Sequence, residues 1–162
     1  MYAFPIFLGI IIFVENKLSD ERIPEIWETE EDKKLSIDGL RRFYKEFALK
    51  NFRHNPYINK NTGWKIRVSA QGIGEIRKFR KREHIILVRF LDTMLEDAIF
   101  FDTVPDEKNT SGIENVSYFD YRCTINGKAY FVKLILKKAL GDDVRFFYYY
   151  NSPYANSGNM IF

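Results

Sequence analysis

Hydrophobic and polar side chains alternate along residues 115–136, on both sides of an Asn126-Gly127 pair. Asn-Gly supplies the positive φ angles of a two-residue type I′ turn, so the pattern predicts a β-hairpin. In that register Asp120 lies directly opposite Lys133, and the pair of opposite charges supports the alignment. The other face collects a mostly apolar set: Ser117, Phe119, Tyr121, Cys123, Tyr130, Val132, Leu134 and Leu136. A slip of one residue would mix the two faces, so the pattern specifies the pairing strongly.

Two upstream segments instead show the spacing of amphipathic helices. Ser36 is a good N-cap for a helix over residues 36–51, whose apolar positions fall on one side. A second helix is expected over residues 83–98, with one apolar stripe formed by Ile85, Val88, Leu91, Leu95 and Ala98. We expect this stripe to pack on the apolar face of the hairpin.

Shorter apolar runs predict further strands at residues 65–68, 99–104 and 144–150. Residues 18–34 and 51–64 are expected to be loops, the first with one helical turn around residues 25–30, and Ser69 to cap a weak helical segment. Residues 151–162 are rich in Asn, Ser, Gly and Pro, which predicts a mobile tail. Helices followed by consecutive strands indicate an α+β fold, with N-terminal helices packed on a C-terminal antiparallel sheet, a meander of about four strands.

The chain begins with an uncharged apolar segment from Tyr2 to Val14. It is shorter than the roughly 20 residues of a membrane-spanning helix, so no stable membrane span is expected. It also lacks the basic start and cleavage site of a secretory signal. A buried strand or an arm that docks on a protein partner is preferred, and a short membrane-associating segment stays open.

Charge is distributed unevenly over the 162 residues, whose net charge is +3. Residues 15–35 hold eight acidic and four basic side chains, so the rest of the chain is seven charges positive. A basic body behind an acidic segment indicates a surface that faces a polyanion. Cys123 is the single cysteine and is expected in the core. With two histidines and no ligand spacing, no metal or other cofactor is expected. The minimal cysteine usage is compatible with a cytoplasmic location.

The order of these elements resembles the large polyvalent-protein-associated domains of phages and conjugative elements, a group of barnase/EndoU/colicin/RelE-like fold. The matching pieces lie at residues 61–69, 91–98, 118–119, 125–134 and 146–148. The resemblance implies a barnase/RelE-like nuclease domain over residues 60–150, preceded by an extension over residues 1–59 and followed by the tail. It also implies metal-independent RNA cleavage, or a descendant that kept the fold and lost the activity.

Such cleavage needs a base for the 2′-hydroxyl proton, an acid for the leaving oxygen and cations for the phosphate. The chain has no His-His or Glu-His pair in matching positions, but members resembling RelE work with Arg, Lys and Tyr. The candidate catalytic residues are therefore His84, Arg122, Lys133 and Tyr148. For Lys133, an ion pair with Asp120 is the alternative to phosphate binding, and His84 could equally be a surface residue.

Five cations in six residues favour a phosphate backbone through counterion release. The candidate nucleic-acid-binding residues are Arg77, Lys78, Arg80, Lys81 and Arg82, extended by Arg145 and Tyr149. A solubilising helix end is the alternative for the five-cation block. Of the consecutive tyrosines 148–150, at least one is expected in the core.

Two functions remain open at this level. The first is an endoribonuclease-like domain of a mobile element, whose acidic segment covers the basic block. The second is a non-catalytic binding or structural module with the same surface.

Overall fold

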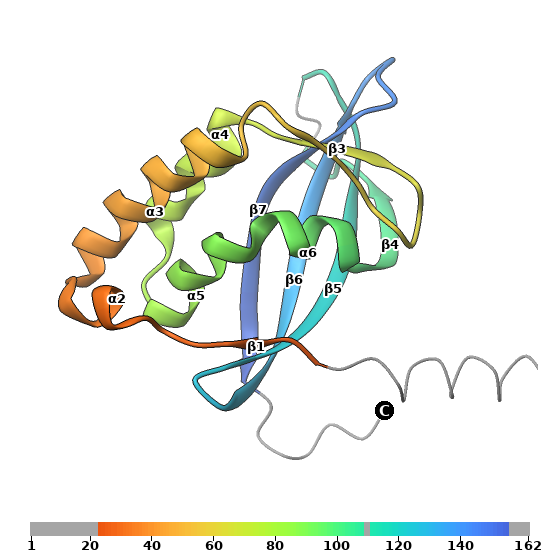
Figure 1. Cartoon of the computed structure of the whole chain (residues 1–162). Coiled ribbons are helices and arrows are strands. Elements are labelled where there is room, and N and C mark those ends of the chain that lie inside the picture. Colours follow the sequence, from red (N-terminus) through yellow and green to blue (C-terminus); the bar gives the residue numbers. More distant parts are fainter. Residues whose placement is uncertain (1–22, 109–110, 156–162) are drawn as a thin grey trace, which may run out of the picture.

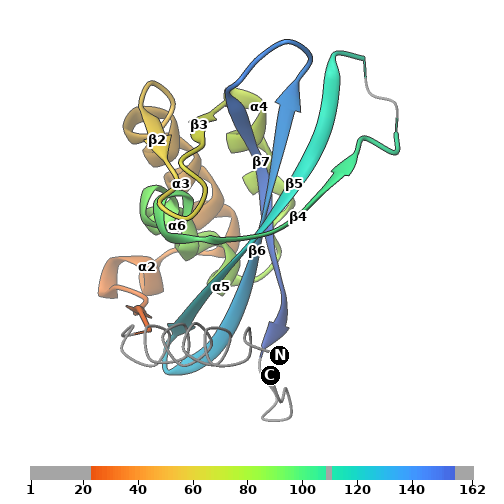
Figure 2. The same ribbon diagram turned by 90° about the vertical axis from the view of Figure 1, so that its right-hand side faces the viewer.

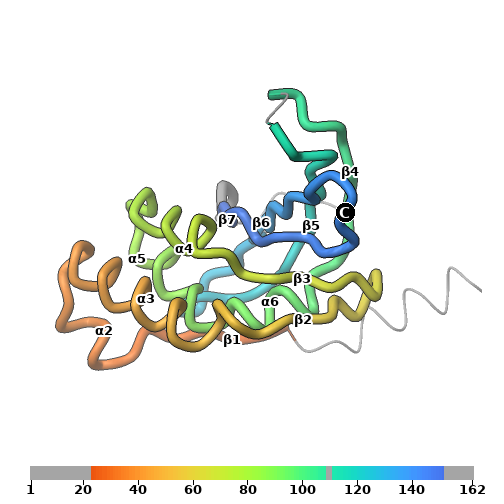
Figure 3. Tube along the Cα trace, turned by 90° about the horizontal axis from the view of Figure 1, so that it is seen from above, coloured from red at the N-terminus to blue at the C-terminus, as the bar shows by residue number. Residues whose placement is uncertain are grey.

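The computed structural model of the chain describes residues 23–108 and 111–155, which form an α+β domain with helices on one face of a sheet (Figures 1 and 3). The helical elements are α2 (Glu30–Lys34), α3 (Ile37–Asn51), α4 (Ala70–Gly74), η1 (Glu75–Lys78), α5 (Arg82–Ile86), η2 (Leu87–Phe90) and α6 (Leu91–Asp97). The strands are β1 (Glu25–Ile26), β2 (Pro56–Ile58), β3 (Lys65–Val68), β4 (Ile99–Pro105), β5 (Ile113–Ile125), β6 (Lys128–Ala139) and β7 (Arg145–Ala155). Strand β7 continues through Ala155, so the first five residues of the tail expected over residues 151–162 belong to the sheet. The segments from Tyr2 to Val14 and from 156 to 162 lie outside the described residues.

The sheet has seven strands in the order β1-β5-β6-β7-β3-β2, with β4 also paired to β5. It is mixed, because β1 runs parallel to β5 and β3 runs parallel to β7. The expected barnase/RelE-like meander of about four antiparallel strands is therefore wrong, although the α+β class holds. Of the strands that overturn it, β1 and β2 have only two and three residues, too few to show a periodic pattern. Strand β3 coincides with the strand expected at residues 65–68, but its parallel pairing with β7 was not expected.

The central hairpin has the predicted register from Ile125 opposite Lys128 to Ser117 opposite Leu136. Asn126 and Gly127 have φ angles of +50° and +80°, as a type I′ turn requires. Phe119 and Val132 are buried on the helical face. The other face of β5, β6 and β7, which the helices leave uncovered, is called the open face below (Figure 2).

The helical layer agrees with the sequence at its start and differs further on. Ser36 caps α3 by accepting a hydrogen bond from the Gly39 amide. The single helix expected over residues 83–98 is wrong, because it is divided into α5, the 3₁₀ turn η2 and α6. The four consecutive residues Ile85, Ile86, Leu87 and Val88 are all buried. One α-helix with a single apolar stripe would turn at least one of four consecutive side chains away from the core. The predicted stripe still enters the same core as the hairpin.

Helix α4 holds the start of the basic segment, residues 75–82 with the basic block (Arg77, Lys78, Arg80, Lys81 and Arg82), against β7. Ser69 caps α4 by accepting a hydrogen bond from the Gly72 amide. A Cβ atom on Gly72 would lie 2.2 Å from the carbonyl oxygen of Phe147, so only glycine permits this approach. The chain that leaves α4, which carries the basic block, therefore runs close to β7.

Candidate nucleic-acid interface

A hollow of about 530 Å³ lies between the basic segment and β7. Strand β7 pairs with β3 only through residues 145–147. Beyond residue 147 this edge of β7 is not paired with β3, and residues 148–151 of β7 line the hollow. The lining residues are Glu75, Lys78, Phe79, Arg80, Lys81, His84, Lys108, Tyr148, Tyr149, Tyr150 and Asn151. The hollow thus combines several cations with aromatic rings.

Aromatic packing fixes one wall of the hollow. The rings of Phe79 and Tyr150 lie 4.8 Å apart, and the Phe79 ring meets the His84 imidazole edge-on at 5.9 Å. The Tyr150 hydroxyl donates a hydrogen bond to the His84 carbonyl oxygen. Complete burial raises the pKa of Tyr150 well above its ordinary value, so this hydroxyl remains a donor. The expectation that one of the three tyrosines lies in the core is confirmed by Tyr150.

The five cations of the basic block divide into three groups, of which the third, Arg82, is described in the next paragraph. Lys78, Arg80 and Lys81 are exposed and line the hollow. Lys78 also forms a 2.6 Å ion pair with Glu75. Arg77 borders a different depression beside α3 and α4. Three of the five candidate cations therefore reach the hollow.

Arg82 turns the other way and holds the acidic segment. Its guanidinium is ion-paired with Glu28 and donates hydrogen bonds to the carbonyl oxygens of Asp32, at 2.6 Å, and Leu35, at 2.7 Å. These bonds use the donors that a phosphate would need. Arg82 is therefore an anchor between α5 and the segment that precedes α3.

Asp32 makes a second anchor in the same segment. It is buried, accepts a 2.7 Å hydrogen bond from the Tyr44 hydroxyl and lies 3.3 Å from the Arg89 guanidinium. Burial alone would raise the pKa of Asp32, but hydrogen bonds from Thr29 and Tyr44, together with the Arg89 charge, hold it below its ordinary value. Glu28 and Arg89 were not singled out from the sequence, because the contacts that give them a role join distant segments.

Cations and aromatic rings also alternate across the open face. The Arg122 guanidinium lies 5.1 Å from the centre of the Phe131 ring. The Lys133 ammonium lies 5.4 Å from the Tyr118 ring and 5.8 Å from the Phe101 ring. Among residues 23–108 and 111–155, no ion pair joins Lys133 to Asp120, so the alternative role for Lys133 is not what the structure shows.

Strand register connects the hollow to the open face. Lys133 is the direct partner of Asn151, and Ile135 is the direct partner of Tyr149. Asn151 and Tyr149 both line the hollow, and direct partners across two strands share a face. Lys137 on β6 lies 3.8 Å from the Tyr148 ring, so Tyr148 also belongs to this junction. The hollow therefore opens onto the open face at Lys133.

Arg145 lies elsewhere. Its guanidinium is 3.3 Å from the centre of the Trp64 ring, and Trp64 packs against Phe100 and Phe119 on the helical side of the sheet. Burial lowers the pKa of Arg145. Arg145 is thus separated by the sheet from the cations of the open face.

The predicted site residues therefore fall into three sets. One set surrounds the hollow: Lys78, Arg80, Lys81, His84, Tyr148 and Tyr149. Arg122 and Lys133 lie on the open face next to it, and Arg77, Arg82 and Arg145 are directed elsewhere. Sequence reasoning missed Lys137 and Phe101 as members of the surface. The alternation that placed Lys133 on the polar side of β6 also places Lys137 there and could have identified it.

The fold and this surface define an α+β domain with a basic and aromatic face. The chain belongs to the family described as large polyvalent protein-associated domain 3, which matches residues 36–149, from α3 to β7. This membership confirms the predicted resemblance to polyvalent-protein domains and is in keeping with the expected mobile-element context. No curated protein and no solved structure matches the chain.

Two properties of the described residues bear on partners. No helix in residues 23–108 and 111–155 is both long and apolar enough to cross a membrane. Within that part of the chain, no group of three or more His, Cys, Asp and Glu side chains is placed to hold a metal ion.

Cys123 is buried, and burial raises the pKa of its thiol to about 12, in keeping with a core position.

Proposed function

We propose that this domain binds single-stranded RNA, with the phosphates and the first bases held in the hollow between the basic segment and β7. The observation that carries the proposal is the convergence of Lys78, Arg80 and Lys81 with Tyr148 and Tyr149 around one hollow. Cations neutralise phosphates, and aromatic rings stack on bases that are not paired. Neither component alone would favour RNA over another anion.

The charge around the hollow supports a backbone contact. Of the lining side chains, Lys78, Arg80, Lys81 and Lys108 are basic and Glu75 alone is acidic. Because Glu75 pairs with Lys78, the charge available to a ligand comes mainly from the other three. Burial raises the pKa of Tyr149, so its ring stays neutral and suited to stacking at physiological pH.

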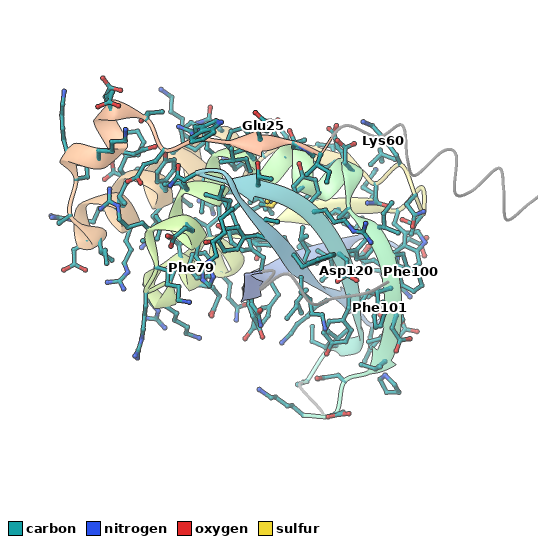
Figure 4. All side chains as sticks on the ribbon, turned by 90° about the horizontal axis from the view of Figure 1, so that it is seen from below. Glu25, Lys60, Phe79, Phe100, Phe101 and Asp120 are labelled. Atoms are coloured by element: carbon teal, nitrogen blue, oxygen red, sulfur yellow. The ribbon has the colours of Figure 1, made fainter. Side chains whose placement is uncertain are left out.

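A labelled 12-nucleotide RNA, titrated with the full chain in EDTA, tests binding by fluorescence anisotropy. We expect an affinity that falls steeply with salt, and the Lys81→Ala variant should reduce the slope of log K against log salt by roughly 0.7. Lys60→Ala is the matched control, because Lys60 is exposed and lies on the other side of the sheet from Phe101 (Figure 4). An RNA that is not retained even at low salt would refute the proposal.

A second candidate function is metal-independent cleavage of the bound RNA. His84 and Tyr148 line the same hollow as the cations, which favours this candidate. An imidazole nitrogen can accept or donate a proton, so His84 would take the 2′-hydroxyl proton or protonate the leaving oxygen. Arg122 and Lys133, the other two candidate catalytic residues, lie on the adjoining open face, where they would contact the phosphates of the same strand.

Gel analysis of the same RNA after incubation in EDTA separates the two functions. Cleavage that is lost in the His84→Ala variant, with binding retained, would identify an endoribonuclease. Intact RNA with salt-sensitive retention would leave a binding module. Lys133→Ala should then weaken binding without any change in the integrity of the RNA.

A further inference from the structure

A strongly exposed aromatic ring of the sheet lies beyond the hollow, on β4. Phe101 is 65% exposed. The register of β4 against β5 shifts between Phe100 and Asp102, which makes Phe101 the extra residue of a bulge. Phe100 packs in the aromatic cluster with Trp64, whereas Phe101 is directed toward Lys133. Bulges commonly redirect a side chain in this way next to functional sites.

We propose that the open face is a second subsite for the same RNA strand, with a base stacked on Phe101 and phosphates held by Lys133 and Arg122. This inference depends on the proposed function and extends it. The hollow would bind one part of the strand and the open face the next, so affinity would depend on the length of the RNA.

Charge and continuity favour this occupant. Arg122, Lys133 and Lys137 are the cations on the central strands of this face, and each lies over an aromatic ring. Lys133 lies beside Asn151 of the hollow, so no gap in the sheet separates the two subsites. A cation next to an exposed ring provides both a phosphate contact and a stacking platform for one nucleotide.

Carboxylates on the same face restrict the path of the strand. Asp120 lies opposite Lys133, and Asp102 lies on the outer strand beside Tyr118. Figure 4 shows Asp120 on the same side of the molecule as Phe101. Phosphates should therefore run over β6, along Lys137 and Lys133, and turn toward Arg122 instead of crossing Asp120.

The strand spacing sets the length of RNA that is required. From Asn151 on β7, over Lys133 on β6 and past β5, to Phe101 on β4, the sheet spans three strand spacings of about 4.8 Å each, about 14 Å in all. Stacked nucleotides advance by about 3.4 Å, so about four nucleotides span this distance. A tetranucleotide in the hollow would leave the open face largely empty, whereas a nonamer would occupy both subsites.

The experiment compares a tetrauridylate with a nonauridylate in EDTA by fluorescence anisotropy. We expect the nonamer to bind more tightly, and Phe101→Ala to weaken nonamer binding by at least about fivefold, the effect of losing one stacked base. Lys133→Ala should weaken nonamer binding as well. Phe43→Ala, which truncates another half-exposed phenylalanine on α3, should have no effect, and neither should Lys60→Ala.

A second measurement distinguishes the two proposals. A nonamer containing 4-thiouridine should cross-link to peptides that contain Phe101 and to peptides from residues 148–151. If the nonamer binds but cross-links only to residues 148–151, and the Phe101 and Lys133 variants bind normally, the second subsite is wrong and the hollow alone is the site. If the nonamer does not bind the unaltered chain, the proposed function itself fails.

Discussion

A single buried carboxylate, Asp32, links the acidic segment to the helical layer. Its pKa is lowered in the folded chain, where hydrogen bonds from Thr29 and Tyr44 favour the ionised form. A group whose pKa is lowered by folding adds stability above its unfolded pKa of about 3.9, and that contribution is lost as the pH falls through the folded pKa.

The Asp32→Asn variant should therefore be less stable than the unaltered chain at pH 7, because it loses the ion pair with Arg89 and its charge-assisted bond from Tyr44. The difference should shrink as the pH approaches 3. Urea denaturation at several pH values measures this. A stability difference that stays constant from pH 7 to pH 3 would contradict a role for the ionised carboxylate.

Two adjacent cations, Lys81 and Arg82, should behave in opposite ways. Arg82→Ala removes the bonds to Glu28 and to the carbonyl oxygens of Asp32 and Leu35, so we expect a loss of roughly 1–3 kcal/mol in the free energy of unfolding. Lys81 is exposed at the hollow, so Lys81→Ala should weaken RNA binding with almost no change in stability.

Thermal unfolding and RNA titration of both variants check this separation. Equal effects of the two variants on RNA affinity would mean that the whole basic block binds the ligand. That result would require Arg82 to leave the acidic segment on binding, as in the hypothesis that the acidic segment covers the basic block.

At the scale of elements, the contact between α4 and β7 is decided by one glycine. An alanine at position 72 would place its Cβ 2.2 Å from the Phe147 carbonyl oxygen, so backbone must move. We expect Gly72→Ala to cost about 1–3 kcal/mol of stability, as overpacking of a close contact does. The shift would also disturb the edge of β7 at the hollow.

Gly74 provides the matched control two residues further along the same helix. Apart from its chain neighbours and the backbone of its own helix, no atom lies within 4 Å of the Cβ position at Gly74. Gly74→Ala should therefore be neutral or stabilise the fold by about 0.4–1 kcal/mol through the unfolded state. Thermal unfolding of both variants measures the difference, and equal destabilisation would show that helix geometry, not the approach to Phe147, limits this position.

The elements that could be predicted from sequence are those specified by local patterns. The hairpin was predicted to the residue, because Asn126-Gly127 fixes the turn and alternation fixes the faces. The parallel pairs formed by β1 and β3 could not be predicted, since strands of two and four residues depend on partners far away in the sequence.

The same distinction between local pattern and distant contact holds for the site. Local charge predicted Lys78, Arg80 and Lys81 as a group, and these three line the hollow, whereas the surroundings of Arg82 and Arg145 depend on tertiary contacts with Glu28 and Trp64.

At the scale of the whole molecule, the two sides of the sheet carry different charge arrangements. The described part of the acidic segment, residues 23–35, lies against α5 and η2 on the helical side, where Glu28 and Asp32 pair with Arg82 and Arg89. At the hollow, Arg80 and Lys81 are exposed, and on the open face Lys133 and Lys137 lie over aromatic rings. A polyanion is therefore expected to approach the hollow and the adjoining open face.

On that face Asp120 opposes the approach, because it lies directly across from Lys133 and forms no ion pair with it among the described residues. Replacing the carboxylate by an amide removes one negative charge without altering the shape of the side chain. Asp120→Asn should raise the affinity for the nonauridylate severalfold at low salt, and the gain should shrink as salt screens the interaction. Glu46→Gln, which removes an exposed charge from α3 in the helical layer, is the control and should have a smaller effect. Anisotropy titrations at 50 and 200 mM salt measure these affinities. Proteins that depend strongly on phosphate contacts lose about 10³–10⁵ in affinity between these two concentrations, so the range is wide enough. If both variants raise the affinity equally, the ligand responds only to net charge, and a strand path over β6 is not supported.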